Sequence, residues 1–291
     1  MNRIARLAAI GLLIAAPAWA QRKVDEVRPL AADGTVEITN LAGSVQVVGW
    51  SNNQVEITGV LGKNVADLEI YGDENELSIE VDAPRHADDL DTELVIKIPS
   101  NAGVGVETVS ASIQVEGVSG PVELQSVSGT IAVSGAPSEL YAESVSGDIT
   151  VARAGIRTDI EVVSGSVVVH DGSGELSVDT VSGNVSITGG LFEAASFESV
   201  SGNIGFAAQM SSRGEYDFET VSGAVNLMVS PAVSAEFYVE TFSGTIQNAI
   251  GPEARSTSQY TQQKELEFTA GSGGAEVSIS TFSGGVQIST Q

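Results

Sequence analysis

Residues 175–187 read ELSVDTVSGNVSI, and the fold depends on the pattern in this stretch. Leu176 and Val178 alternate with polar residues before the V-S-G triplet, and Val185 and Ile187 alternate in the same way after it. Apolar residues at every second position, rich in Val, Ile and Thr, predict β-strands, and Ser-Gly between two such runs predicts a turn. We attribute the glycine to a sharp corner with positive φ, which glycine adopts at little cost. The stretch therefore predicts a strand, a corner and a second strand.

The same motif recurs along the chain, with successive serines 9, 9, 18, 18, 18, 19, 21, 21 and 40 residues apart. A unit of about 18–21 residues accommodates two short strands and two turns, and identical coils stack about 4.8 Å apart. About nine such coils predict a parallel β-solenoid roughly 45 Å long. The motif residues, which we interpret as structural turn residues, are Ser110, Ser119, Gly120, Ser128, Gly129, Ser146, Gly147, Ser164, Gly165, Ser182, Gly183, Ser201, Gly202, Ser222, Gly223, Ser243, Gly244, Ser283 and Gly284.

An antiparallel β-sandwich is the alternative fold, because it also has short strands at regular spacing. Repeats that stay in step favour stacking instead, since equivalent residues then form ladders. Helical folds are excluded because no segment after residue 20 keeps a 3.6-residue apolar period beyond about two turns. The sequence predicts an all-β solenoid.

Three segments follow from the composition. Residues 1–20, MNRIARLAAIGLLIAAPAWA, have the basic start, short apolar run and small-residue site of a signal peptide, with cleavage expected before Gln21. Residues 21–106 form a β-rich segment that we expect to be continuous with the solenoid and to start it. Residues 107–291 contain the V-S-G repeats. The chain has no cysteine, so its stability has to come from packing and hydrogen bonds rather than disulfides.

The direction in which the motif side chains point is left open. Continued alternation places Thr180 and Ser182 inside the corner and Val181 outside, whereas a bulge at the corner would bury the valines. In the first case the motif valines form an exposed apolar stripe, a feature that monomers rarely expose without a partner. This candidate partner-binding stripe comprises Val109, Val127, Val145, Val163, Val181, Val200, Val221, Phe242 and Phe282.

Nothing in the sequence predicts catalysis, a cofactor or a metal site. There is no G-x-S-x-G, S-x-x-K, H-E-x-x-H or P-loop, and the only histidines are His86 and His170. The acidic turns at 72–76 and 86–91 do not follow a calcium-loop pattern. A net charge of −25 argues against binding to nucleic acid or anionic lipid. Polysaccharide-cleaving β-helices use clustered aspartates, but four candidates recur at no common position in the coil: Asp148, Asp159, Asp171 and Asp179.

The repeats carry a family resemblance. The segments GTVEITNLAGSVQVVGWSNNQVEITG and LVIKIPSNAGVGVETVSASIQVEGVSGPVELQSVSGTIAV, with the V-S-G units that follow, resemble the DUF4097 "putative adhesin" family of β-strand repeat proteins over roughly residues 30–290. The resemblance implies a right-handed β-helix-like fold and an exported location. In Gram-positive relatives it also implies a link to envelope-stress sensing. It supplies no catalytic residues.

We therefore expect an exported, non-enzymatic β-solenoid that binds or supports a component of the cell envelope, either a protein or a glycan. The periplasm is the expected location. With no transmembrane-length stretch after residue 20, we do not expect an integral membrane protein. The alternatives are a surface adhesin and, less favoured, a carbohydrate-active β-helix enzyme. The oligomeric state is left open.

Overall fold

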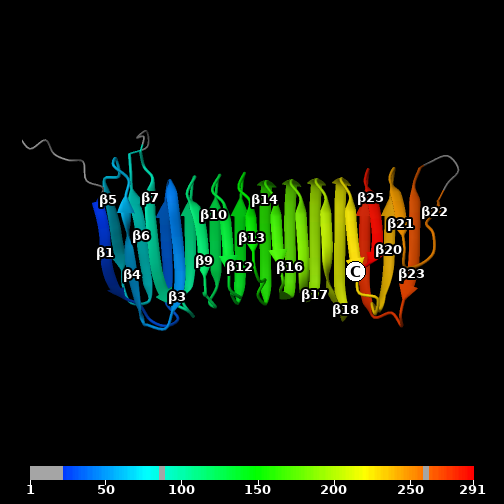
Figure 1. Cartoon of the computed structure of the whole chain (residues 1–291), viewed down its shortest axis with the longest axis horizontal. Helices are drawn as coiled ribbons and strands as arrows, with labels where there is room; N and C mark the ends of the chain where they lie inside the picture. The colour runs from blue at the N-terminus through cyan, green and yellow to red at the C-terminus, as the bar shows by residue number, and fades with distance from the viewer. Residues whose placement is uncertain (1–21, 85–88, 258–261) are drawn as a thin grey trace, which may run out of the picture.

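The computed structural model describes residues 22–84, 89–257 and 262–291, which form 25 strands arranged as a straight rod (Figure 1). The strands lie on two faces, and each V-S-G corner except that at 118–120 connects a strand of face 1 to the following strand of face 2. The long strands β17 and β18 run from face 2 of one coil to face 1 of the next, so the two faces belong to one hydrogen-bonded sheet.

The order of strands along face 1 is β5 (Asp67–Gly72), β6 (Glu76–Asp82), β2 (Thr35–Asn40), β8 (Gly103–Thr108), β10 (Val122–Ser126), β12 (Glu139–Ser144), β14 (Arg157–Ser164), β16 (Ser173–Ser182), β17 (Val185–Ser201), β18 (Ile204–Ser222), β24 (Ala275–Thr281), β20 (Ala235–Thr241), β23 (Lys264–Ala270) and β22 (Arg255–Ser256). The order along face 2 is β1 (Arg22–Pro29), β4 (Gln54–Leu61), β7 (Thr92–Pro99), β3 (Gly43–Trp50), β9 (Ser112–Glu116), β11 (Ile131–Ser134), β13 (Ile149–Val151), β15 (Val167–His170), β17, β18, β19 (Val225–Val229), β25 (Gly285–Thr290) and β21 (Thr245–Asn248).

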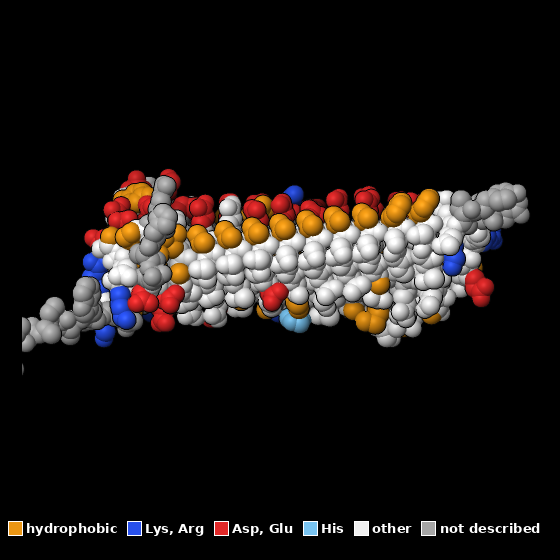
Figure 2. Space-filling view, turned by 90° about the horizontal axis from the view of Figure 1, so that it is seen from above, with side chains coloured by type: hydrophobic (Ala, Val, Ile, Leu, Met, Phe, Trp, Pro, Cys, Tyr) orange, Lys and Arg blue, Asp and Glu red, His pale blue; other side chains and the backbone are white. Residues whose placement is uncertain are grey.

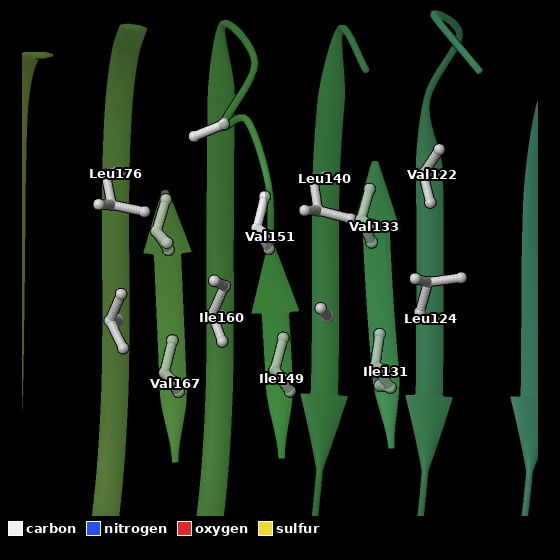
Figure 3. Close-up of a cluster of buried hydrophobic side chains, with 14 of the residues drawn as sticks. Val122, Leu124, Ile131, Val133, Leu140, Ile149, Val151, Ile160, Val167 and Leu176 are labelled. Atoms are coloured by element: carbon white, nitrogen blue, oxygen red, sulfur yellow. The ribbon is translucent and has the colours of Figure 1, made fainter. Parts of the chain in front are cut away.

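Strands in the middle of the rod pair in parallel with the equivalent strands of the adjacent coils. Ile160 pairs with Val178 on face 1, and Ile149 pairs with Val167 on face 2. The alternating apolar residues of both faces point inward and form ladders that fill the interior, as Figure 3 shows for Ile131, Ile149 and Val167. The predicted β-solenoid is confirmed, because an antiparallel sandwich has neither this parallel pairing nor this register.

The motif glycines are required for a different reason from the one we predicted. None of those from Gly129 onward has a positive φ. Instead, a Cβ at Gly183 would lie 1.9 Å from the carbonyl oxygen of Gly165, and one at Gly202 would lie 1.8 Å from that of Gly183. Each glycine corner is therefore stacked against the backbone of the corner before it, which leaves no room for a side chain.

The first steps between motif serines are only nine residues long because Ser119 lies at the opposite corner of the coil. Ser119 and Gly120 lie between β9 and β10, and both of their amides donate to Ser100 O. Val118, which precedes them, is buried rather than exposed. These two residues are turn residues, but they do not belong to the corner that the other motif residues form.

Antiparallel strands cover both ends of the rod. At the N-terminal end β4 pairs antiparallel with β7 and with β1, and β5 pairs antiparallel with β6. At the other end β23 pairs antiparallel with β20, and β22 with β23. Strands β2 and β3 pair directly with β8 and β9, so the N-terminal strands stack on the repeats without a break.

The last coil is inserted rather than added. Strand β24 lies between β18 and β20, and β25 lies between β19 and β21, although both follow them in sequence (Figure 1). This insertion explains the final step of 40 residues between motif serines. The chain first forms the outer coil, β20 and β21, and then returns through β22 and β23 to fill the space inside it.

Aromatic side chains fill the wider coils near this end. Phe197 and Phe218 stack with ring centroids 5.0 Å apart, and Phe206 meets both edge-on at 5.8 and 5.7 Å. Residues 22–84, 89–257 and 262–291 contain no helix long and apolar enough to cross a membrane.

Candidate binding groove

The V-S-G corner has a defined inside and outside, and the residue before the valine occupies the inside. Thr180 is buried at 6 % exposure, whereas Val181 is 49 % exposed. The equivalent Ser126 and Ser144 are also buried, and their hydroxyls each accept a hydrogen bond from the amide of the motif glycine at 2.8 Å. Of the two orientations that the sequence left open, the structure has the one with outward valines.

The motif serine, in contrast, does not join the threonine inside, as continued alternation had placed it. Ser128 is exposed; its amide donates to Val109 O at 2.9 Å and its hydroxyl donates to the same oxygen at 3.1 Å. Ser146 makes the same pair of bonds to Val127 O. The chain begins to turn at the valine, so alternation no longer applies to the next residue. The serine instead fastens each corner to the preceding one.

The outward motif residues form one continuous line along the rod, which we call the apolar row. Figure 2 shows this row as an orange line over the length of the molecule. Its members are 44–56 % exposed, and Phe242 and Phe282 stack on each other at 4.9 Å. In order along the rod the row is Val109, Val127, Val145, Val163, Val181, Val200, Val221, Phe282 and Phe242.

A second row, of carboxylates, runs parallel to the apolar row two residues earlier on each face 1 strand. In the strand register, Glu143 lies opposite Glu161 of the next coil, and Asp179 lies opposite Glu198. The same alignment continues from coil to coil. Figure 2 shows acidic side chains along this side of the apolar row and uncharged ones along the other. We call these residues the carboxylate row, and we call each position of a row, one per coil, a rung. Its members are Glu107, Glu143, Glu161, Asp179, Glu198, Glu219 and Glu240, and two further rungs are the uncharged Gln125 and Ser280.

Between the two rows lies a groove of about 630 Å³ that extends from the coil of Glu143 to that of Glu240. One wall is the apolar row, the other is the carboxylate row, and the inward Ser and Thr positions lie between them. The side chain of Gln263 lines it as well. The groove therefore extends over seven successive coils and presents negative charge beside the apolar row on all of them except the coil of Ser280.

Stacking like charges has an electrostatic cost in this row. Burial, together with Glu198, Glu161 and Asp159, raises the pKa of Asp179 above its ordinary value. Burial together with Glu143 and Glu161 raises the pKa of Tyr141 to about 12. Within the described residues, no ion pair involves a member of the carboxylate row. No lysine or arginine of the described residues is therefore paired with a carboxylate of this row.

The carboxylate row was not predicted, because aspartates alone were considered as an acidic cluster. Asp148 accepts from the amide of Ser166 at 2.8 Å, and Asp159 pairs with Arg157 at 3.1 Å. Asp171 lies 3.7 Å from Arg153, and of the four only Asp179 belongs to the row. The signal was readable as an acidic residue two positions before the motif valine, in E-S-V-S-G (143–147) and E-T-V-S-G (219–223).

His170, which no motif in the sequence marks as catalytic, is exposed at the end of β15, and its Nδ1 lies 3.1 Å from Thr188 Oγ1. His86 lies outside the described residues. In the acidic turn at 72–76, Asp73 Oδ1 accepts from the amides of Asn75 at 2.8 Å and Glu76 at 3.2 Å. These backbone bonds lower the pKa of Asp73 and tie the turn of a hairpin.

The stacked coils, the fastened corners and the exposed rows define a parallel β-solenoid repeat protein. Within that class the chain belongs to the DUF4097 family, described as Toastrack, whose model matches residues 31–289. No curated protein matches the chain.

Several solved structures resemble the rod along almost its whole length. A "putative adhesin" from Parabacteroides distasonis is 13 % identical, covers 91 % of this chain and 97 % of its own, and has a TM-score of 0.46. A "putative adhesin" from Bacteroides fragilis is 12 % identical, with coverages of 93 % and 98 % and a TM-score of 0.43. A "putative lipid binding protein" from P. distasonis is 14 % identical, with coverages of 91 % and 96 % and a TM-score of 0.39. At this similarity none of these names is transferred to the chain.

Proposed function

We propose that this protein is an exported, non-enzymatic binding protein of the cell envelope, located in the periplasm, that holds a partner along the groove between its apolar and carboxylate rows. The observation that carries the proposal is the apolar row. Nine outward Val and Phe side chains, each about half exposed, lie in one line. Soluble monomers rarely expose apolar residues in a contiguous patch unless something binds there.

The repetition of the same geometry on successive coils supports binding rather than catalysis. A catalytic centre needs a unique arrangement of acid, base or nucleophile, whereas the groove repeats the same two side-chain types on successive coils. Among the described residues the one histidine is His170, which lies at the surface with its ring nitrogen in contact with Thr188. A long, repetitive surface suits an elongated partner, since each coil adds the same increment of contact.

The binding role can be tested by site-specific crosslinking, because the chain has no cysteine of its own. Val181→Cys places a thiol in the groove, and Ser186→Cys places one on exposed β17 of face 2. Treated with a membrane-permeable thiol crosslinker, cells with the groove cysteine should give a discrete adduct that the face 2 control lacks. The adduct should disappear when Val163→Ser and Val200→Ser are added. Equal adducts from both positions, or none from the groove, would contradict the proposal.

The location is tested separately with Ser256→Cys in β22, an exposed position. Labelling by a membrane-impermeant maleimide only after permeabilisation of the outer membrane is the result expected for a periplasmic protein. Labelling of untreated cells would place the protein on the surface and would favour adhesion instead.

A further inference from the structure

We propose that the partner segment held in this groove is an amphipathic α-helix of another protein, with lysine or arginine along one flank of its apolar stripe. The proposal rests on the binding role proposed above and specifies the chemistry of the partner.

The two walls of the groove determine which side chains it can bind. The apolar row offers Val and Phe side chains, and a partner has to cover them with apolar side chains of its own. The carboxylate row beside it has no ion pair within the described chain, and its like charges lie in register on adjacent coils, as Asp179 and Glu198 do. Burial first, and then the neighbouring carboxylates, raise the pKa of Asp179. Cations placed along this wall relieve the repulsion between these carboxylates, whereas an acidic or neutral partner leaves it in place.

The charge is confined to one side. On the other side of the apolar row lie the motif serines, which are exposed, small and uncharged, as in Ser164 and Ser182. A bulky partner can approach closely over these residues. The groove therefore matches a segment whose basic residues flank its apolar stripe on one side only.

The spacing of the rungs favours a helix over an extended strand. Rungs recur about every 4.8 Å. The i, i+3, i+7 stripe of an α-helix has apolar residues about 3.5 positions apart on average and so places one about every 5.3 Å along the axis, a mismatch of roughly 0.5 Å per coil. Alternate residues of a strand recur about every 6.6 Å, a mismatch of roughly 1.8 Å, and lose register within two rungs. The six intervals of the groove span about 29 Å, the length of about 19 helical residues.

A second copy of this chain matches the groove poorly. Each copy has a net charge of −25, and pairing two apolar rows would bring both carboxylate rows to the same interface. The same negative charge disfavours anionic lipid. Charge complementarity thus selects a basic partner.

The test uses purified protein and a synthetic 19-residue helical peptide with leucines at i, i+3, i+7 spacing and lysines along one flank of the leucine stripe. Two comparison peptides have the lysines replaced by glutamate, or the same lysines moved opposite the leucines. In isothermal titration calorimetry at low salt, only the first of the three peptides should bind. High salt should weaken the affinity of that peptide.

The protein variants separate the groove from general charge. Glu161→Gln, Asp179→Asn and Glu198→Gln together should weaken binding at least about tenfold. A control of equal charge change on the same face, Glu139→Gln, Glu215→Gln and Glu276→Gln, should change the affinity less than about twofold. Val163→Ser, Val181→Ser and Val200→Ser together should also abolish binding. Because all nine side chains are outward, unchanged far-UV circular dichroism is expected for every variant.

Equal binding of the lysine and glutamate peptides, equal effects of the two carboxylate triples, or a dimer in light scattering whose formation needs the apolar row would overturn the proposal. If no peptide binds while the Val181→Cys crosslink in cells persists, the helix is wrong and the binding role stands. If the crosslink is also absent, both fail.

Discussion

Replacing Gly183 with alanine should destabilise the rod far more than a typical surface substitution, because the new methyl group has no space. Its Cβ would lie 1.9 Å from Gly165 O, a backbone atom that cannot rotate away. A carbon–oxygen contact needs about 3.3 Å, so the two corners would have to separate by about 1.4 Å. The nearby bond from Val167 N to Asn184 O, now 2.9 Å, would be broken by such a movement.

The expected loss follows from these two effects. Overpacking costs about 1–3 kcal/mol, and one or two lost hydrogen bonds add about 1 kcal/mol each, which gives a total of about 2–5 kcal/mol. The matched control is Gly205→Ala in β18, where the nearest atom to the new Cβ is Val185 O at 3.7 Å. The control should be neutral or stabilising by up to about 1 kcal/mol, since alanine restricts the unfolded chain more than glycine does.

Urea unfolding followed by far-UV circular dichroism would measure both variants. Because solenoids unfold in nearest-neighbour fashion, amide hydrogen exchange in the adjacent coils, at Ser164 and Ser201, should also accelerate in Gly183→Ala. If Gly183→Ala lies within about 0.5 kcal/mol of the wild type, close backbone approach is not what the motif glycine provides, and the reasoning is refuted.

Three further substitutions test the interior and the carboxylate row by urea unfolding. Phe218→Ala removes a fully buried ring that stacks on Phe197, and we expect a loss of about 3–5 kcal/mol; a loss below 1 kcal/mol would mean that the aromatic cluster repacks. Thr180→Val replaces a buried hydroxyl that has no partner among the described residues, at a rung where the neighbouring coil already has Val162, and should stabilise by about 1 kcal/mol, whereas destabilisation would indicate an unseen hydrogen bond. Asp179→Asn should raise the urea midpoint at neutral pH, where the raised pKa of Asp179 makes its ionised form unfavourable in the fold. As the pH falls through that raised pKa, the folded chain is protonated before the unfolded chain and the wild type recovers stability. The advantage of the variant should therefore be lost below the ordinary Asp pKa of about 3.9, and an advantage independent of pH would exclude charge as its cause.

The rod itself could be predicted from sequence because parallel stacking turns a local pattern into a global one. Leu176, Val178, Val185 and Ile187 alternate in sequence, and the same alternation fills the interior. The side occupied by Ser182 could not be obtained by counting, since alternation holds only while the strand remains straight. The role of Gly183 was also hidden, because contact with Gly165 belongs to the neighbouring coil and not to the local turn.

Two larger features needed the structure for different reasons. The carboxylate row was present in the sequence and would have been found by aligning the repeats on their valines. The insertion of β24 and β25 could not have been found in this way, because the motif around Phe282 looks like that around Phe242 and nothing local says which coil lies outermost.

The inserted coil has a consequence for how the rod is completed as the chain emerges from the ribosome. Coils up to β18 and β19 can dock in the order in which they appear, each on the one before. Strands β20 and β21 appear next, but their neighbours in the finished rod are β24 and β25, which do not yet exist. Until residues 275–290 arrive, β18 keeps an open edge that any other strand can join. The rod can therefore be completed only after synthesis has passed β24 and β25. A chain that ends between β21 and β24 would keep the unpaired edge of β18.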